Sequence, residues 1–312
     1  ILLKNVFYII RCGVIHYICK AKVQVSVTLV ASTGCNKRKR RYANMQHLGK
    51  LEKIIYSAQD GIATIIMNDP SNLNAIDEQM ADELLTAFQR AVQDAEVKVV
   101  VLKGLEKAFS AGGDIRYFYQ RIQAGGEVSI DELIAKVGVL ADHMKRMGKL
   151  IVVAVSGPAA GAGVSLALGG DFLICADNAK FILAFVNLGL VPDTGATYLL
   201  SKSVGVARAL ALAATGRPVN ALEAQSLGLA HMVVPKAELD EAAMKLAREL
   251  AAGPLVAYSN LKRQIYDANF RDYRRWLQET EIPTQHACGQ SEDFKEGVKA
   301  FIEKRTPKFS GC

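Results

Sequence analysis

The sequence contains two copies of one local pattern, in which a β-branched run ends in a glycine-rich turn and a helix follows. The first strand is expected at 97–102 with its turn at 107–115, and the second at 150–155 with its turn at 156–164. Short β-branched runs bounded by glycine predict buried strands, and strands that alternate with helices predict an α/β fold. We therefore expect an α/β protein in which each of these turns stands at the start of a helix.

The segments on either side extend this organisation. Residues 53–69 (KIIYSAQDGIATIIMND) form two apolar runs around the Asp-Gly pair at 60–61, which predicts a hairpin, and Asp77 is expected to cap the helix that follows. Three helical stretches are expected at the end of the chain, at 237–252, 254–270 and 271–304. No glycine-rich linker precedes them, so we predict a core at 45–236 and a C-terminal helical region at 237–312 that pack as one unit.

The positive charge of the chain is concentrated at its N-terminus. The 312 residues carry 38 Lys and Arg against 31 Asp and Glu, a formal charge of +7, but residues 1–44 hold nine of the basic residues and none of the acidic ones. The other 268 residues therefore have a net charge of −2. A nucleic-acid partner, which a basic protein would suggest, is not expected for them.

Residues 1–44 form a basic leader that we predict is not part of the fold. They lack the apolar core and cleavage site of a secretory signal, and the alternation in KVQVSVTLV (22–30) does not suit the amphipathic helix of a mitochondrial leader. Translated upstream sequence or an added segment, an organelle leader, and a functional arm built on the basic cluster 37–41 are the alternatives. We expect a cytoplasmic protein, or one of the mitochondrial matrix if the leader is genuine.

Membrane and metal functions find no support in the sequence. No run of eighteen or more uncharged apolar residues occurs, so a membrane-spanning helix is not expected. The cysteines Cys175, Cys288 and Cys312 are far apart and show no spacing of a metal site. The expected compartment is reducing, with no structural metal.

The two glycine-rich turns are the first candidates for chemistry. Small residues let a ligand approach the backbone closely, and the free N–H groups at a helix start point toward whatever binds there. Neither turn is a dinucleotide fingerprint or a phosphate-binding loop with Gly-Lys-Ser/Thr. Two such turns can supply two backbone N–H groups to one oxygen, which makes an oxyanion hole worth a few kcal/mol per donor.

Six motifs, taken together and in order, give the sequence a family resemblance. They are PSNLNAI (70–76), AFSAGGDI (108–115), VSGPAAGAGV (155–164), LGLVPDTGAT (188–197), the pattern GxxxxAxxAxxxGLA at 216–230, and EGVKAFIEKRxPxF (296–309). With these motifs the chain resembles the enoyl-CoA hydratase/isomerase (crotonase) superfamily. The resemblance implies a crotonase-like spiral of ββα units with a C-terminal helical trimerisation region. It also implies an acyl-CoA thioester substrate, no separate cofactor, and a homotrimer or hexamer.

The resemblance assigns roles to individual residues. The backbone N–H groups of Ala111 and Ala162 match the family's two oxyanion donors. Ser165 and Phe185 occupy the positions of the two glutamates that hydratases use, and neither side chain can activate and protonate as a carboxylate does. Asp193 instead matches the acidic residue of the family's Δ3,Δ2-enoyl-CoA and ring-1,2-epoxyphenylacetyl-CoA isomerases, with capping of the next helix as the alternative role.

The resemblance also marks residues that would contact the substrate or its CoA part. These residues are Leu73, Ala75, Ala108, Phe109, Gly112, Gly113, Asp114, Ile115, Phe185, Phe301 and Lys304. For Asp114 a helix cap is the favoured role, and for Lys304 a solvated helix end is an equal alternative. An apolar pocket lined by Phe185 and Phe118 would raise the pKa of Asp193 toward neutrality.

These features predict an acyl-CoA isomerase that shifts a double bond or rearranges a ring epoxide through a thioester enolate. The tail and the LVPDTGAT motif favour the phenylacetate-catabolism branch over the fatty-acid branch. The alternatives are an enoyl-CoA hydratase that uses other groups, and a non-catalytic homologue that binds acyl-CoA or RNA.

Overall fold

The structure is a computed structural model, and it divides the chain into two units, 1–48 and 49–312. It describes residues 8–11, 14–18, 24–28, 51–124 and 131–312. The first unit contains an antiparallel three-stranded meander of β1 (Tyr8–Arg11), β2 (Val14–Ile18) and β3 (Gln24–Thr28). Residues 24–28 of the alternating segment thus form a strand, in keeping with its period of two, whereas the basic cluster 37–41 lies outside the described residues.

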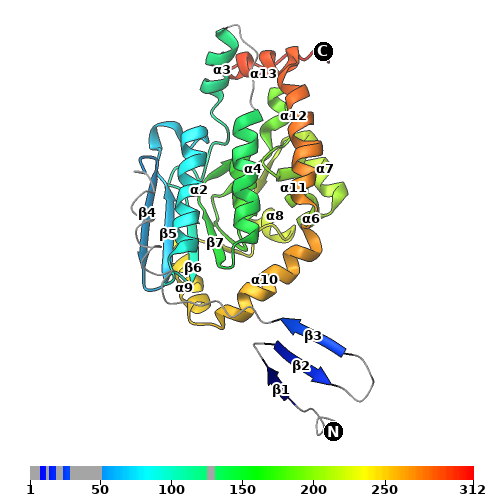
Figure 1. Cartoon of the computed structure of the whole chain (residues 1–312). Helices are drawn as coiled ribbons and strands as arrows, with labels where there is room; N and C mark the ends of the chain where they lie inside the picture. The colour runs from blue at the N-terminus through cyan, green and yellow to red at the C-terminus, as the bar shows by residue number, and fades with distance from the viewer. Residues whose placement is uncertain (1–7, 12–13, 19–23, 29–50, 125–130) are drawn as a thin grey trace. The chain divides into compact units, whose positions relative to one another are not determined.

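The second unit is built on a six-stranded sheet of order β12-β9-β7-β6-β5-β4 (Figure 1). Its strands are β4 (Ile54–Gln59), β5 (Ile62–Met67), β6 (Val99–Lys103), β7 (Leu150–Val155), β9 (Phe172–Ala176) and β12 (Met232–Val234). Only the β4–β5 pair within this sheet is antiparallel. The turn between these two strands has positive φ at Asp60 (53°) and Gly61 (80°), so the predicted hairpin and the α/β class are confirmed.

Both faces of this sheet are buried, which accounts for its uninterrupted β-branched runs. On β6, Val100 and Leu102 pack into the main core with α2 (Glu78–Gln93) and α4 (Asp131–Arg146). Residues Val99 and Val101 point to the other face, where α9 (Leu239–Ala251) covers them. Asp77 caps α2 as predicted, because its Oδ1 accepts a hydrogen bond of 2.8 Å from the N–H of Met80.

A second, smaller sheet lies beyond the carboxyl end of β7. Its order is β11-β10-β8, made of β8 (Pro158–Ala160), β10 (Lys180–Ile182) and β11 (Pro218–Asn220). The short helices of this region are α5 (Ala162–Gly169), the 3-10 turn η2 (Ala184–Leu188), α6 (Ala196–Val204), α7 (Val206–Thr215) and α8 (Ala221–Ser226). These elements carry the second glycine-rich turn and the segment with Asp193.

The C-terminal region is helical, but its last stretch is not one helix. Figure 1 shows a run of consecutive elements that ends with α13 beside α3 (Ile115–Gln123). They are α10 (Leu255–Asn269), α11 (Tyr273–Trp276), the π-helical turn η4 (Leu277–Glu281), α12 (Ile282–Gly289) and α13 (Glu292–Ile302). Pro283 lacks an N–H and crowds the preceding turn, and Ser291 caps a new helix by accepting from the N–H of Phe294 at 3.0 Å. Within the described residues, no helix has the length and apolar character needed to cross a bilayer.

Candidate active site

The two glycine-rich turns meet backbone to backbone. The N–H of Phe109 donates to the carbonyl of Pro158 at 3.0 Å, and the N–H of Ala160 donates to the carbonyl of Ser110 at 2.9 Å. Gly112 has a φ of +89°, and a Cβ atom on it would lie 2.6 Å from the carbonyl oxygen of Ala160. Only glycine fits this approach, so the small residues in the first turn serve to bring the second turn against it.

A buried asparagine that the sequence analysis missed holds a third loop to these turns. The side chain of Asn74 donates to the carbonyls of Ala108 and Phe109, each at 3.2 Å. The hydroxyl of Ser110 donates back to the carbonyl of Asn74 at 2.7 Å. The available signal was a polar residue between the apolar positions Leu73 and Ala75 of PSNLNAI, because a polar side chain among buried residues needs hydrogen-bond partners.

The hydrogen bonds of this cluster correct the predicted oxyanion donors. The N–H of Ala111 already donates to the carbonyl of Leu73 at 2.9 Å, so it is not directed at a ligand. In contrast, the N–H groups of Gly113 and Ala162 have no acceptor among the described residues. Both residues line one cavity, and Ala162 is the first residue of α5, where an N–H has no partner within the helix. The prediction for Ala111 is therefore wrong, and Gly113 takes its place as the free donor.

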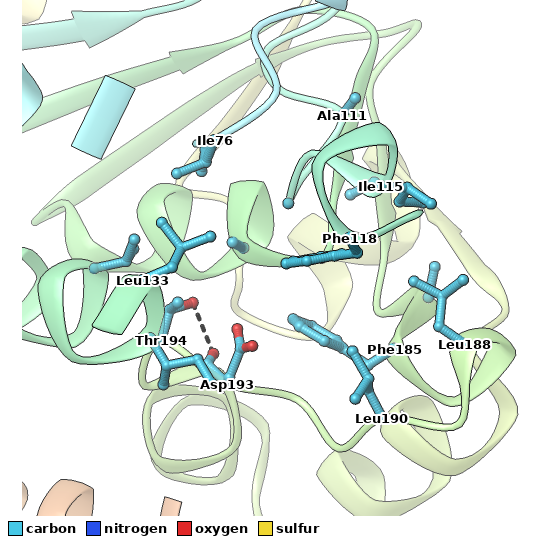
Figure 2. Close-up of a pocket in the computed structure, with 17 residues that line it drawn as sticks. Ile76, Ala111, Ile115, Phe118, Leu133, Phe185, Leu188, Leu190, Asp193 and Thr194 are labelled. Carbon is cyan, nitrogen blue, oxygen red and sulfur yellow. Dashed lines mark hydrogen bonds between the residues drawn. The ribbon is translucent and has the colours of Figure 1, made fainter. Parts of the chain in front are cut away.

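The cavity between these turns and the following helices is largely apolar (Figure 2). The space among its lining atoms, including the open mouth, is about 660 Å³. It brings together these residues singled out from the sequence: Ala111, Gly113, Ile115, Phe118, Ala162, Phe185 and Asp193. Helix α4 adds Leu133, Ile134 and Val137 to the wall. Of the described residues that line the cavity, Asp193 alone is ionisable.

The carboxyl group of Asp193 has one bound and one free oxygen. Its Oδ2 accepts a hydrogen bond of 2.8 Å from the side-chain amide of Gln285, whereas Oδ1 has no partner among the described residues. In Figure 2 the group points into the space below Phe118 and beside Phe185. Burial raises the pKa of Asp193 to about 7, against the opposing effect of the hydrogen bond from Gln285. A carboxyl with this pKa is half ionised near neutral pH, which suits proton transfer.

The backbone around Asp193 is fixed from several sides. The hydroxyls of Thr194 and Ser165 donate to the Asp193 carbonyl at 2.7 and 3.1 Å. Thr194 has a φ of 57°, and the next N–H, on Gly195, donates to both carboxylate oxygens of Glu281 at 3.0 and 2.9 Å. Gly195 is the N-cap of α6, which has no side-chain cap, so Asp193 does not have the alternative role of capping this helix.

The remaining predicted contact residues do not line the cavity. Phe109 is fully buried in the core, and this corrects its prediction as a substrate contact. Ala75 and Ala108 are also buried, Gly112 lies at the contact between the turns, and Leu73 is partly exposed.

Asp114 caps helix α3, which is the role that the sequence favours. It accepts from the N–H of Arg116 at 2.9 Å and from the side chain of Asn72 at 2.8 Å. Phe301 and Lys304 are exposed at the C-terminal end of α13.

Two free backbone N–H groups beside one buried carboxyl are typical of a class of protein, the enzymes that stabilise a developing oxyanion and transfer a proton. The chain belongs to the enoyl-CoA hydratase/isomerase family, whose model matches residues 57–312, and it has the crotonase fold.

Its relatives include both isomerases and hydratases. It is 32% identical to the trans-2-decenoyl-[acyl-carrier-protein] isomerase of Streptococcus mutans over 83% of this chain and 98% of that one. It is 34% identical to the 1,2-epoxyphenylacetyl-CoA isomerase of Escherichia coli, over 84% and 99%. Among solved structures, an enoyl-CoA hydratase from Mycobacterium avium subsp. paratuberculosis is similar with a TM-score of 0.76 and 33% identity, over 84% of this chain and 100% of that one.

Proposed function

We propose that this protein is an enoyl-CoA isomerase, which moves a double bond along an acyl thioester by a proton transfer through one carboxyl group. The observation that carries the proposal is the free Oδ1 of Asp193, the only ionisable group among the described residues of a largely apolar cavity. An isomerase needs a single base that removes a proton and returns it elsewhere.

The free backbone N–H groups supply the second requirement. With the thioester oxygen at Gly113 and Ala162, both N–H groups donate to it, and their effect grows as negative charge develops on that oxygen. Each such donor contributes about 3 kcal/mol to the transition state. The donors form part of the backbone, so no side chain has to reorganise during the reaction.

The proton balance follows from this arrangement. Oδ1 of ionised Asp193 takes a proton from the carbon between the thioester carbonyl and the double bond of a 3-enoyl group. The electron pair forms a dienolate, whose charge lies largely on the thioester oxygen at the two N–H groups. The same carboxyl then returns the proton to the far end of the dienolate, which gives the 2-enoyl thioester with unchanged mass.

Hydration receives less support from the same residues. Water addition needs a group that activates water and a group that protonates carbon. At the two positions where hydratases have glutamates, this chain has Ser165, whose hydroxyl donates to the Asp193 carbonyl, and Phe185, whose ring lines the cavity. Neither side chain replaces a carboxylate.

We also propose which acyl groups the cavity accepts and which carrier holds them. The two isomerase relatives are named for a decenoyl chain on acyl-carrier protein and for a ring epoxide on CoA. The apolar wall of α3, α4 and η2 suits either an alkyl chain or a phenyl ring. We propose CoA as the carrier and part of the substrate, with no separate cofactor, and the family's homotrimer or hexamer as the assembly.

The test is a panel of thioesters analysed by mass spectrometry. It should contain 3-enoyl-CoA and 2-enoyl-CoA of several chain lengths, 1,2-epoxyphenylacetyl-CoA, and one 2-enoyl group on acyl-carrier protein. Conversion without a change in mass supports an isomerase, and a gain of 18 Da on 2-enoyl-CoA would replace it with a hydratase. Thermal stabilisation by acyl-CoA without turnover would indicate a binding protein.

A further inference from the structure

Gln285 approaches the Asp193 segment from behind the cavity wall. It lies on α12, one helical turn after the π-helical turn η4, and its side chain is completely buried. It does not line the cavity, so it has no contact with a substrate there. π-helical turns are rare and occur often at functional sites, and this one directly precedes the helix that carries Gln285.

Two hydrogen bonds fix the orientation of the Gln285 amide. Its Oε1 accepts from the N–H of Val191 at 3.0 Å, and its Nε2 donates to Oδ2 of Asp193 at 2.8 Å. A backbone N–H can only donate, so the amide oxygen must face Val191 and the NH₂ group must face Asp193. The contact with Asp193 is therefore a donated hydrogen bond.

We infer that Gln285 is a positioning residue that holds Asp193 by Oδ2, so that Oδ1 alone carries the proton during isomerisation. This inference rests on the proposed function. Because the second oxygen is held, the carboxyl cannot rotate freely, and its unbound oxygen stays directed into the cavity (Figure 2). The same oxygen removes the proton from one carbon of the allylic system and returns it to another carbon. Its position must therefore stay constant between these two proton transfers.

The chemical type of the contact also suits a base that works near neutral pH. An amide is a neutral donor, so it stabilises the carboxylate by one hydrogen bond without adding a positive charge. The titratable groups that the structure places around the Asp193–Gly195 turn are Glu281 on η4 and Tyr273 on α11, both acidic. Neither of these groups carries a positive charge, so the hydrogen bond from Gln285 opposes the effect of burial, which favours the protonated carboxyl.

The test replaces the amide in two ways and follows the pH profile of isomerisation. In Gln285→Met the donor is lost at similar volume, and in Gln285→Glu the donor is replaced by a second titratable carboxyl. For both variants we expect the acid limb of kcat/KM to move upward by about one to two pH units, and the activity at pH 7 to fall about 5- to 50-fold. The KM for the 3-enoyl-CoA substrate is expected to stay within about threefold, since the residue does not line the cavity.

The matched control is Thr284→Ala, the neighbouring exposed residue of the same helix, whose hydroxyl donates back to the backbone carbonyls of Thr280 and Glu281 at 2.7 and 3.1 Å and has no contact with Asp193. Its pH profile should equal that of the parent. Circular dichroism and thermal unfolding establish that each variant is folded, and Gln285→Glu, which keeps the shape of the residue, serves if Gln285→Met does not fold. An unmoved acid limb in a folded variant would overturn the inference.

The failure of this inference is distinguishable from that of the proposed function. If Asp193→Asn retains isomerase activity, Asp193 is not the base and the proposed function fails. If Asp193→Asn is inactive while the Gln285 variants keep the parent's pH profile, the base assignment stands and only the positioning role is refuted.

Discussion

Two buried carboxyl groups lie on either side of one turn, and they differ in what their oxygens contact. Asp193 is 9% exposed and Glu281 is 2% exposed. Burial raises the pKa of Asp193 to about 7, and burial together with the charge of Asp193 raises the pKa of Glu281 to about 8. By pKa alone, the two groups are equally good candidates for an acid–base residue.

Their surroundings separate them. Both oxygens of Glu281 accept the N–H of Gly195, and the side chain does not line the cavity. Asp193 lines the cavity and keeps one oxygen free of hydrogen bonds from the described residues. A perturbed pKa therefore indicates burial, and access to the reacting atoms must come from geometry.

The largest expected effect comes from removing each carboxyl in turn. Asp193→Asn should lower kcat for a 3-enoyl-CoA by about 10²- to 10⁴-fold, the usual contribution of a general base. Glu281→Gln should lower it less than about tenfold, since the amide oxygen still accepts from Gly195. Isomerisation is followed by the absorbance of the conjugated product.

Equal losses in the two variants would contradict this comparison, because they would show that Glu281 takes part in the chemistry. Retention of activity in Asp193→Asn to within a few-fold would remove Asp193 as the base. Thermal unfolding of both variants provides the control for folding.

The next effect concerns the backbone N–H donors. Of the standard amino acids only proline lacks this N–H, so a substitution by proline is needed to remove a donor. Ala162→Pro deletes the N–H at the first position of α5, where proline suits a helix. We expect kcat/KM to fall about 10²- to 10³-fold, as for the loss of one oxyanion donor. Val206→Pro is the matched control: it makes the same change at the start of α7, after a glycine N-cap, at a residue 76% exposed.

Activity in Ala162→Pro equal to that of Val206→Pro would show that the Ala162 N–H does not contact the substrate. The acyl-CoA affinity of Ala162→Pro, measured by calorimetry, separates a lost transition-state contact from a blocked cavity. A blocked cavity abolishes binding, whereas a lost donor leaves most of the affinity.

The fold was largely predictable from the sequence, because periodicity and turn chemistry act locally. The Asp-Gly hairpin, the Asp77 cap and the β-branched strands each depend on a few adjacent residues. The single helix expected at 271–304 failed because Pro283 and Ser291 interrupt it, and both signals were present in the sequence.

The site was less predictable, since its key contacts join distant segments. Gln285 and Glu281 lie about ninety residues from the turn that they hold, and nothing in their local sequence indicates this contact. The error at Ala111 has a similar cause. Which N–H in AFSAGGDI is free depends on Leu73, whose carbonyl takes the N–H of Ala111. A motif identifies such a loop, and only the folded backbone decides which of its donors is unbound.

A third, smaller effect is the pH dependence of isomerisation. The base must be ionised, so kcat/KM should rise with pH and level off above a midpoint near 7, the pKa of Asp193. Below the midpoint the rate should fall about tenfold per pH unit, which gives roughly a thirtyfold loss at pH 5.5. A flat profile from pH 5.5 to 8 would exclude a base with this pKa, and the stability of the protein over the same range is the control.

The smallest effect is on stability, and it has the opposite pH dependence. In the folded protein the pKa of Glu281 is raised from 4.5 to about 8, so the fold binds more protons than the unfolded chain between these values. The stabilisation is complete below pH 4.5, decreases as the pH rises, and is gone above pH 8. Glu281→Gln cannot ionise, so its stability relative to the parent should increase by roughly 1–2 kcal/mol from pH 5 to pH 8.5, as measured by urea unfolding. A constant difference would mean that the pKa of Glu281 is not raised by folding, whereas an increase would show that Glu281 stabilises the parent least in the pH range where Asp193 is active.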